Sequence, residues 1–461
     1  MQPAYDTIII GAGMSGLAAG IRLAMFGQRV CIVERHTKVG GLNSFYRRGG
    51  RDYDVGLHAL TNYAPPGARR GPLPLLLRQL RLDGRDLDLA PQIGSTIAFP
   101  GVSLDFGNEF GLLESEVGRQ FPGQKDAFQR LVGQILDYDQ LGSAAGARSA
   151  REVAGSLIRE PLLLEMLFCP LLYFGGSREN DLDFGQFSVL FRSIYLEGLA
   201  RPRHGVRRLL DSLVRKFEQL GGELRLGRAV RRIVSRDSAA HSLLCGDGAE
   251  LTAQRFLSSA GWPETRQLLE DQEPFAAEPA GQLSFLETIL VLDAPPRDLG
   301  CRRTIVFYND APVFRYQKPD DLVDEHSGVI TSPNNFQYDE PLEEGVVRVT
   351  ALANWDRWAA LEPPAYEQAK LACRQRVLAS AVRFVPDFRH AVVASDTFTP
   401  LTIHRFTGRR RGAVYGSPEK RYDGTTPLRN LFLCGTDQGL VGIVGAIISG
   451  ITIANRHLLR G

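Results

Sequence analysis

Glycine residues near the N-terminus have the spacing of a phosphate-binding turn. Gly11, Gly13 and Gly16 follow the apolar, β-branched run of residues 7–10, a pattern that predicts a strand, a tight turn and a helix. Gly11 would allow the sharp bend, Gly13 would let the backbone approach a pyrophosphate, and Gly16 would let the helix lie close to the strand. The free N–H groups at the start of the helix would then point at phosphate oxygens.

An acidic residue follows at the distance expected for a ribose-binding group. Residues 28–34 predict a second strand that ends in Glu34, about twenty residues after the first glycine. A carboxylate at this point can accept hydrogen bonds from two ribose hydroxyls and repels a 2′-phosphate. The alternative is a glycine-rich turn that binds nothing, and the strand before it, the helix after it and the acid disfavour that alternative.

Paired glycines after the acid extend the pattern. Gly40 and Gly41 stand where a second stretch of backbone can approach a pyrophosphate without Cβ clashes. This arrangement resembles the flavoprotein superfamily of amine oxidases, protoporphyrinogen oxidases and phytoene desaturases, in which the acid precedes a Gly-Gly loop under FAD. Residues 48–58 resemble the segment that passes beside the flavin ring in that superfamily, which implies that Gly56 and Leu57 lie near the flavin.

The C-terminal forty residues contain a second strand, turn and helix. Residues 430–434 lead into Gly435 and Asp437, and a helix begins at Gly442, which predicts another anion site at a helix start. The segment resembles the superfamily's C-terminal FAD motif, which implies that Asp437 meets the ribityl-phosphate region and that the helix start faces the flavin. A helix-capping role is the alternative for Asp437.

Two middle segments resemble parts of the family that return to the cofactor. Residues 203–234 resemble the desaturase segment that leads into a strand touching adenine, which implies a backbone contact from Val230. Residues 257–263 end another strand with small residues, including Ala260. The residues that we expect to bind FAD are Gly11, Gly13, Met14, Ser15, Gly16, Glu34, Arg35, Gly40, Gly41, Leu42, Gly56, Leu57, Val230, Ala260, Gly435, Asp437, Gly442, Ile443 and Val444.

The order of these segments predicts an α/β protein with two domains. We expect a Rossmann-like FAD-binding domain that is discontinuous, and a substrate-binding domain of mixed β-sheet plus helices. The FAD-binding domain takes residues 1–90, 204–263 and 421–461, and the substrate-binding domain takes residues 91–203 and 264–420. Helical periodicity predicts helices over residues 206–220 and 366–384, and β-rich runs predict strands at residues 286–292, 305–308, 329–332 and 346–352.

Composition narrows the class of protein. The 461 residues are 44% hydrophobic and 23% charged, with a net charge of +2, which is typical of a globular protein and gives no sign of nucleic-acid binding. The six cysteines form no CxxC motif, so we expect no metal site and a reduced, cytoplasmic protein. No apolar run is long enough to span a membrane and the first strand leaves no room for a signal peptide, although peripheral contact with a membrane fits an apolar substrate.

Three segments allow both a structural and a functional interpretation. Residues 157–174 are strongly apolar, and their simplest role is core packing, with a membrane-dipping element or tunnel wall as the alternative. The same choice between core and tunnel applies to the aromatic residues at 184, 187, 191 and 195. The run Arg409–Arg411 is most simply a solvated loop, and binding to lipid phosphates is the other option.

Candidate catalytic residues follow from the resemblance and from residue type. His58, His404 and Tyr415 are the polar groups that we expect at the substrate face of the flavin, as proton acceptors or orienting donors. For His404 and Tyr415 a hydrogen-bonded position in the core is the alternative.

The resemblance implies an FAD-dependent oxidoreductase acting on a small-molecule apolar substrate. Residues 399–416 resemble the carotenoid isomerase and retinol saturase branch, so we expect desaturation, saturation or isomerisation of a long isoprenoid or polyene. The loop of residues 436–441 lacks the family's proline-rich spacing, which leaves the substrate open. No second GxGxxG motif is present, so oxygen or a quinone is the expected electron acceptor. The alternatives are a flavin amine oxidase and a lipid-binding chaperone that resembles the Rab GDP-dissociation inhibitors.

Overall fold

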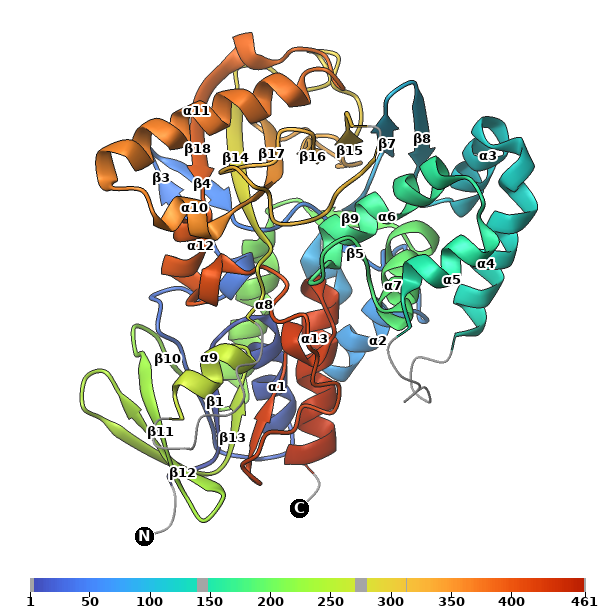
Figure 1. Cartoon of the computed structure of the whole chain (residues 1–461). Coiled ribbons are helices and arrows are strands. Elements are labelled where there is room, and N and C mark those ends of the chain that lie inside the picture. Colours follow the sequence, from blue (N-terminus) through green and yellow to red (C-terminus); the bar gives the residue numbers. More distant parts are fainter. Residues whose placement is uncertain (1–3, 139–147, 270–279, 312, 460–461) are drawn as a thin grey trace.

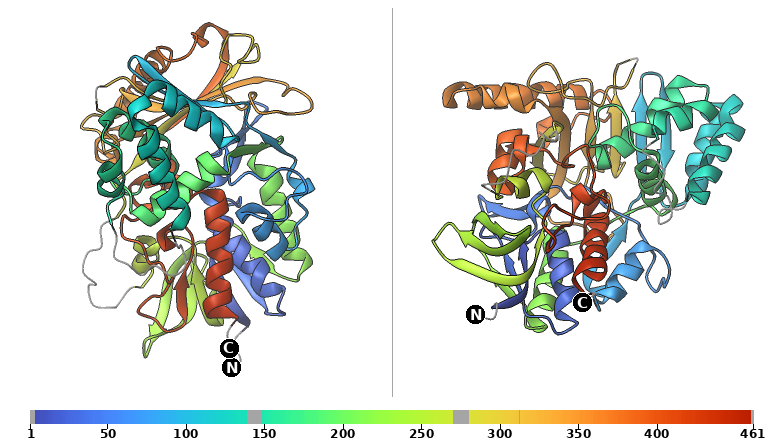
Figure 2. Two further views of the ribbon diagram at one scale, coloured as in Figure 1. Left: turned by 90° about the vertical axis from the view of Figure 1, so that its right-hand side faces the viewer. Right: turned by 60° about the horizontal axis from the view of Figure 1, so that its bottom comes forward.

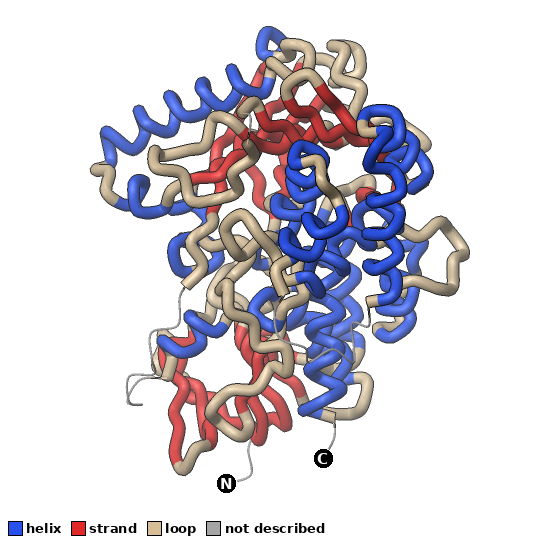
Figure 3. Tube along the Cα trace, turned by 45° about the vertical axis from the view of Figure 1, so that its right-hand side comes forward, coloured by secondary structure: helices blue, strands red, loops and turns tan. Residues whose placement is uncertain are grey.

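Two seven-stranded sheets lie at opposite ends of the molecule, with helices between and beside them (Figure 1). The structure is a computed structural model that describes residues 4–138, 148–269, 280–311 and 313–459. Figure 3 shows the two groups of strands at the top and bottom of the view, and most of the helices gathered on one side between them.

The first sheet is built around β1 (Tyr5–Ile10), whose last four residues are buried. β1 pairs in parallel with β2 (Val30–Val33) on one side and with β13 (Glu250–Ser258) on the other. A strand that is buried on both faces needs an unbroken apolar sequence, and residues 7–10 supply one. The order is β10-β2-β1-β13-β12-β11, and β19 also pairs with β13. The remaining strands are β10 (Glu223–Arg225), β11 (Val230–Arg236), β12 (Ala239–Cys245) and β19 (Leu431–Leu433).

Helices from both ends of the chain pack together on this sheet. α1 (Met14–Ala24) follows β1, and α13 (Gly442–Ile453) follows β19. Figure 2 shows α13, in red, beside the blue α1. α8 (Val206–Gln219) covers the same face, because its apolar residues recur at the helical period and are buried. The two ends of the chain therefore form one layer.

The second sheet is mixed and forms the upper part of Figure 1. Its order is β18-β14-β17-β16-β15-β7-β8, and only β15 and β7 are parallel neighbours. Helix α11 (Pro363–Ala381) packs on one face of it. The strands are β7 (Ser95–Phe99), β8 (Val102–Phe106), β14 (Ser284–Leu292), β15 (Ile305–Asn309), β16 (Ser327–Thr331), β17 (Gly345–Ala353) and β18 (Val392–Phe398).

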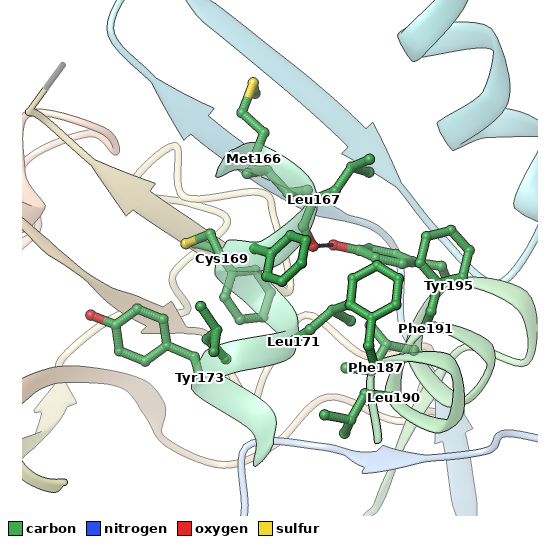
Figure 4. Packing of buried hydrophobic residues seen from close by; sticks show 14 of the residues in the cluster. Met166, Leu167, Cys169, Leu171, Tyr173, Phe187, Leu190, Phe191 and Tyr195 are labelled. Atoms are coloured by element: carbon green, nitrogen blue, oxygen red, sulfur yellow. Dashed lines mark hydrogen bonds between the residues drawn. The ribbon is translucent and has the colours of Figure 1, made fainter. Parts of the chain in front are cut away.

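A helical layer encloses the largest apolar core. It contains α3 (Phe110–Gln120), α4 (Lys125–Asp137), α5 (Ala150–Leu157), α6 (Pro161–Gly175) and α7 (Phe184–Phe191). Figure 4 shows α6 packed against aromatic side chains of α7 and the turn after it, where the Tyr195 hydroxyl donates to the Leu167 carbonyl at 3.1 Å. The apolar run and the aromatic stripe are therefore core elements. Among the described residues no helix is long and apolar enough to cross a membrane.

The remaining helices and strands are short. They are β3 (Phe45–Arg48), β4 (Arg51–Asp54), β5 (Leu60–Thr61), β6 (Leu89–Pro91), β9 (Leu199–Pro202), α2 (Pro72–Gln79), α9 (Trp262–Gln267), α10 (Trp355–Ala359) and α12 (Pro400–Thr407). The expected α/β class, with a Rossmann-like sheet and a second mixed sheet, is confirmed. The domain boundaries stay a prediction. The six cysteines are buried and free, and the described residues contain no cluster of potential metal ligands.

Candidate functional site

A cavity of about 680 Å³ extends from the glycine turn after β1 to the face of the second sheet. Its volume lies within the range of ligand sites in proteins. Residues from both sheets line it, together with the starts of helices α1 and α13. Its two ends differ in chemistry, because glycines and arginines surround one end and aromatic and aliphatic side chains surround the other.

The first glycine turn lines the cavity at the start of α1. Gly11 has a φ of +97°, and the Ser259 hydroxyl donates to its carbonyl at 3.0 Å. A Cβ on Gly16 would lie 2.1 Å from the Gly11 carbonyl oxygen, so Gly16 allows helix and turn to pack and does not line the cavity. A Cβ on Gly13 would meet nothing within 4 Å. Gly13 therefore leaves open space where a ligand can approach the backbone.

Glu34 joins this turn to the end of β2. Its Oε2 accepts a hydrogen bond from the Ala12 N–H at 2.8 Å, and its Oε1 accepts one from the His36 N–H at 2.8 Å. The side chain is buried and lines the cavity. Each carboxylate oxygen keeps a further lone pair that can accept a hydrogen bond from a ligand hydroxyl. The acid therefore holds the turn in place and can also bind a ligand.

The Gly-Gly loop closes over the first turn. Gly40 has a φ of +110°, and its N–H donates to the Ala12 carbonyl at 2.9 Å. A Cβ on Gly41 would lie 3.7 Å from the Gly13 Cα atom. Gly56, with a φ of +68°, packs on this loop, since a Cβ there would lie 2.3 Å from the Leu42 carbonyl oxygen. Residues 40–42 and Gly56 all line the cavity.

The C-terminal turn brings a second helix start to the cavity. The Gly435 N–H donates to the Ser449 hydroxyl at 2.7 Å. Gly442 and Ile443 begin α13 and line the cavity, and a Cβ on Gly442 would meet nothing within 4 Å. Val444 points into the core. The positive ends of α1 and α13 thus face one cavity, an arrangement that favours an anionic ligand.

Asp437 lies behind the cavity wall and not in its lining. Its Oδ2 accepts from the Trp262 N–H at 2.7 Å, and its Oδ1 accepts from the Ser417 N–H at 2.9 Å. The residue is 1% exposed. We expected this carboxylate to meet a ribityl-phosphate group. The structure instead shows the carboxylate accepting hydrogen bonds from two backbone N–H groups that are distant in the sequence, which sequence motifs do not reveal.

Arg409 is buried, and the prediction that residues 409–411 form a solvated loop is wrong for this residue. Its Nη2 donates to the Thr436 hydroxyl at 2.7 Å, and its Nη1 lies 3.5 Å from Glu264 Oε2. Burial raises the pKa of the Glu264 carboxyl, and the Arg409 charge opposes that rise. Both residues line the cavity near Ala260 and Val230. Arg409 Nη1 also lies 3.6 Å from Asp437 Oδ2, so the two carboxylates offset the charge of the guanidinium.

The other end of the cavity is mainly apolar. The Tyr415 hydroxyl donates to the Tyr173 carbonyl, and burial raises the pKa of the Tyr415 phenol. Tyr173 belongs to the last turns of α6, so one end of that core helix also forms cavity wall. The apolar lining consists of Ala59, Tyr173, Phe174, Phe285, Val329, Phe398, Val414 and Tyr415.

One row of side chains crosses the second sheet and faces the cavity. The register pairs Phe398 of β18 with Glu287 of β14, Glu287 with Thr350 of β17, and Thr350 with Val329 of β16. All four residues line the cavity. Sequence reasoning missed Glu287 and Thr350. The available signal was a carboxylate within the otherwise apolar strand of residues 284–292.

Two buried ion pairs lie next to this row of cavity-lining side chains. Arg348 donates to Glu287 Oε1 from Nε at 2.6 Å and also from Nη2. Arg201 donates to Asp54 Oδ2 at 2.7 Å. Both arginines also donate to the carbonyl of Leu57, whose side chain packs in the core. Each acid therefore has its own arginine, and the charges of the group balance.

His58 lies between the ion pairs and the cavity. Its Nδ1 is 2.8 Å from the Thr331 hydroxyl, and its Nε2 is 4.0 Å from Glu287 Oε2. Burial, followed by the positive charges of Arg348 and Arg201, lowers the pKa of the imidazole well below its ordinary value. The ring is therefore neutral at physiological pH, and one of its nitrogens can accept a proton.

His404 lies on the exposed surface of α12 and does not line the cavity. Its ring packs on Trp355 with centroids 5.0 Å apart, and its Nδ1 is 2.8 Å from the Arg409 carbonyl. We expected His404, within residues 399–406, at the substrate face of the flavin. These residues instead form a capped helix, and only Ile403 and Thr407 of that helix line the cavity.

The cavity brings together most of the expected site residues. Those that line it are Gly11, Gly13, Met14, Ser15, Glu34, Arg35, Gly40, Gly41, Leu42, Gly56, His58, Val230, Ala260, Tyr415, Gly435, Gly442 and Ile443. Those that do not are Gly16, Leu57, His404, Asp437 and Val444.

Comparison with known proteins places this arrangement among flavoproteins. Residues 14–458 match the family of flavin containing amine oxidoreductases. A prolycopene isomerase from an Oncidium hybrid cultivar is 22% identical over 98% of this chain and 83% of its own length. The all-trans-retinol 13,14-reductase of Rattus norvegicus is 24% identical over 99% and 86%.

A bacterial relative and a solved structure agree with this placement. The neurosporene-forming phytoene desaturase of Rhodobacter capsulatus is 29% identical over 58% of this chain and 54% of its own length. The crystal structure of an oxidoreductase from Methanosarcina mazei superposes with a TM-score of 0.68 at 16% identity, covering 97% of this chain and 99% of that one. The structural match establishes the fold alone.

Proposed function

The chain belongs to the family of flavin containing amine oxidoreductases, and from that premise we propose that this FAD-dependent oxidoreductase acts on a long apolar isoprenoid or polyene. The reaction is a desaturation, a saturation or an isomerisation. The isoalloxazine ring of bound FAD supplies the two-electron chemistry, and the protein supplies binding, orientation and a dry cavity.

The glycine-rich end of the cavity fits FAD. The open space at Gly13 and Gly442 leaves both helix starts accessible to phosphate oxygens, and a larger side chain at either position would fill it. Glu34 has free lone pairs for ribose hydroxyls. Arg35 also lines this end, and its guanidinium suits the pyrophosphate charge. Val230 and Ala260 are then the candidates for the adenine end.

The observation that carries the substrate proposal is the apolar half of the cavity. Its aromatic and aliphatic side chains, from Ala59 to Val414, suit a hydrocarbon chain. The buried acids Glu287 and Asp54 are each paired with an arginine. This end of the cavity therefore has no surplus negative charge for a cationic amine. The names of the relatives, a prolycopene isomerase and a retinol reductase, point to the same chemical class.

Polar groups at the apolar end of the cavity orient the substrate. His58 is neutral, because desolvation and the charges of Arg348 and Arg201 disfavour its protonated form, so its role is to orient a polar group of the substrate through Nε2. The Tyr415 hydroxyl is held by the Tyr173 carbonyl and serves as a fixed part of the wall. Oxygen or a quinone is the proposed electron acceptor, and an apolar substrate is best collected by peripheral contact with a membrane.

Anaerobic incubation of the FAD-loaded protein with candidate substrates tests this function. The panel contains carotenoid precursors, retinoids and amines, and the flavin absorbance and the extracted products are followed. A carotenoid precursor or retinoid that bleaches the flavin supports the proposal. For a redox-neutral isomerisation, product must form on pre-reduced flavin with no net change in its oxidation state. Bleaching by amines alone contradicts the isoprenoid assignment.

A further inference from the structure

A carboxylate oxygen faces the apolar half of the cavity without a partner. Glu287 is 7% exposed and lines the cavity. Both hydrogen bonds from Arg348 go to its Oε1. No described residue donates a hydrogen bond to its Oε2, and the Nε2 atom of the neutral His58 ring lies 4.0 Å from it. An acceptor at a cavity wall completes its hydrogen bonds with a water or with a ligand that can donate.

Two further polar groups converge on the same point. The Thr350 hydroxyl is the cross-strand neighbour of Glu287 and lies 3.4 Å from His58 Nε2. His58 Nδ1 is already occupied by the Thr331 hydroxyl, so Nε2 is the nitrogen that remains for the cavity. The site thus offers a fixed acceptor, Glu287 Oε2, and a hydroxyl or imidazole that can donate.

The chemistry of these groups selects one kind of ligand end. A hydrocarbon would leave Glu287 Oε2 without a hydrogen-bond donor. A carboxylate would be repelled by Glu287, and a carbonyl oxygen could not donate to its Oε2. A cationic ammonium group could donate but could not accept from Thr350, and Arg348 already neutralises the acid. A hydroxyl both donates and accepts, so it satisfies the whole site.

We propose that Glu287 Oε2, with Thr350 and His58, binds a hydroxyl group on the substrate, so that the preferred ligand is an isoprenoid alcohol and not a pure hydrocarbon. This inference rests on the proposed function, because the rest of the ligand must fit the apolar wall. Glu287 acts here as a specificity-determining residue. Sites built to bond a hydroxyl discriminate strongly against analogues without it, because their own polar groups are then left unpaired.

Binding of two matched probes to the FAD-loaded protein tests the proposal. The probes are geranylgeraniol and its methyl ether, which keeps the chain and the oxygen but has no O–H to donate. Binding is followed by quenching of the protein's aromatic fluorescence, so that turnover is not needed. We expect the ether to bind roughly tenfold to a hundredfold more weakly than the alcohol, as the loss of a hydrogen bond to a charged group implies.

Variants locate the preference at Glu287. The double variant Glu287→Met/Arg348→Met removes both charges and the acceptor oxygen together, so no buried ion is left unpaired. It should bind alcohol and ether with similar affinity. The control Thr288→Val lies on the same strand outside the cavity lining, where its hydroxyl pairs with Thr397 at 3.1 Å. It should keep the wild-type preference. Flavin absorbance and the unfolding midpoint report whether each variant is folded and loaded.

The outcomes separate this inference from the proposed function. Equal affinity of the wild type for alcohol and ether overturns the hydroxyl site and leaves the isoprenoid assignment standing. If the double variant then also shows a shifted flavin midpoint potential in the absence of any ligand, Glu287 Oε2 accepts its hydrogen bond from the cofactor and not from the substrate. Binding of neither probe by the loaded wild type overturns both proposals.

Discussion

The backbone of Ser15 in α1 touches Gly450 in α13. A Cβ placed on Gly450 would lie 2.1 Å from the Ser15 carbonyl oxygen and 3.1 Å from the Ala19 nitrogen. Only a residue without a side chain allows the two helices to approach so closely. This contact holds the two helix starts at one cavity, although they come from opposite ends of the chain.

Replacing Gly450 with alanine should therefore separate the two helices. We expect a loss of about 1–3 kcal/mol in the free energy of unfolding, typical of overpacking, and weaker FAD binding. The control is Gly133→Ala in α4, where a Cβ meets nothing within 4 Å and alanine should stabilise by about 0.5–1 kcal/mol. Denaturant unfolding and FAD titration measure both. Equal FAD affinity in the two variants would contradict the assigned role of the contact.

Gly13→Ala separates cofactor binding from folding. Gly13 has a φ of −73° and open space around a Cβ, so alanine fits the FAD-free protein. Its stability should stay within about 0.5 kcal/mol of the wild type. Affinity for FAD should fall at least about tenfold, because the methyl group occupies space beside the phosphates. Calorimetric titration with FAD checks this, with the exposed Gly123→Ala as the control. Unchanged affinity would place the pyrophosphate elsewhere.

Glu34→Gln should weaken both the fold and the cofactor site. The two carboxylate oxygens accept from the Ala12 and His36 N–H groups, and an amide keeps only one acceptor oxygen. One buried donor is left without a partner, at a loss of about 1–3 kcal/mol. Urea unfolding of the FAD-free protein measures this loss, and titration measures the fall in FAD affinity. A variant as stable as the wild type would show that these hydrogen bonds contribute little.

Arg348→Met should be among the most damaging single changes in the second sheet. It removes the partner of the buried Glu287 carboxylate and one donor to the Leu57 carbonyl. Breaking a buried pair from one side destabilises by about 3–5 kcal/mol. Adding Glu287→Gln should restore part of that loss, because no unpaired charge then remains. The unfolding midpoints of the single and double variants provide the measurement. A double variant less stable than the single one would contradict this account.

Acidification should destabilise the protein partly through His58. Burial and the charges of Arg348 and Arg201 lower the pKa of its imidazole in the folded state, while the unfolded chain keeps the ordinary value near 6.5. Below pH 6.5 the unfolded state therefore binds this proton first, and stability falls by about 1.4 kcal/mol per pH unit from this group until the folded pKa is reached.

A His58→Gln variant isolates that contribution. Urea unfolding of both proteins at pH 7.5, 6.5 and 5.5 should show the wild type losing stability more steeply than the variant below pH 6.5. Carboxylates that titrate in the same range affect both proteins equally, so the difference reports the imidazole. Parallel curves would mean that His58 is not buried in its neutral form.

Local patterns in the chain predicted which residues line the glycine-rich end of the cavity, and their contacts with FAD stay a prediction. The turn of residues 11–16 depends on consecutive residues, so glycine spacing identifies it directly. The orientation of the Asp437 carboxylate could not be predicted from neighbouring residues. Its strand-turn position is the expected one, but the donors that turn its carboxylate away come from residues 262 and 417. Likewise, the buried position of Arg409 follows from the distant Glu264.

The sequence by itself determined the α/β class, the two glycine turns that line the cavity and the acid at the end of β2, because each is a short pattern whose backbone requirements are met by neighbouring residues. Only the tertiary structure decided which groups meet the substrate. Glu287, Thr350 and Val329 come from three separate strands, and their alignment depends on the strand register. A shift of one residue in any strand would turn its side chain to the opposite face of the sheet. That register is set by packing of the whole second sheet, which no short stretch of the chain contains.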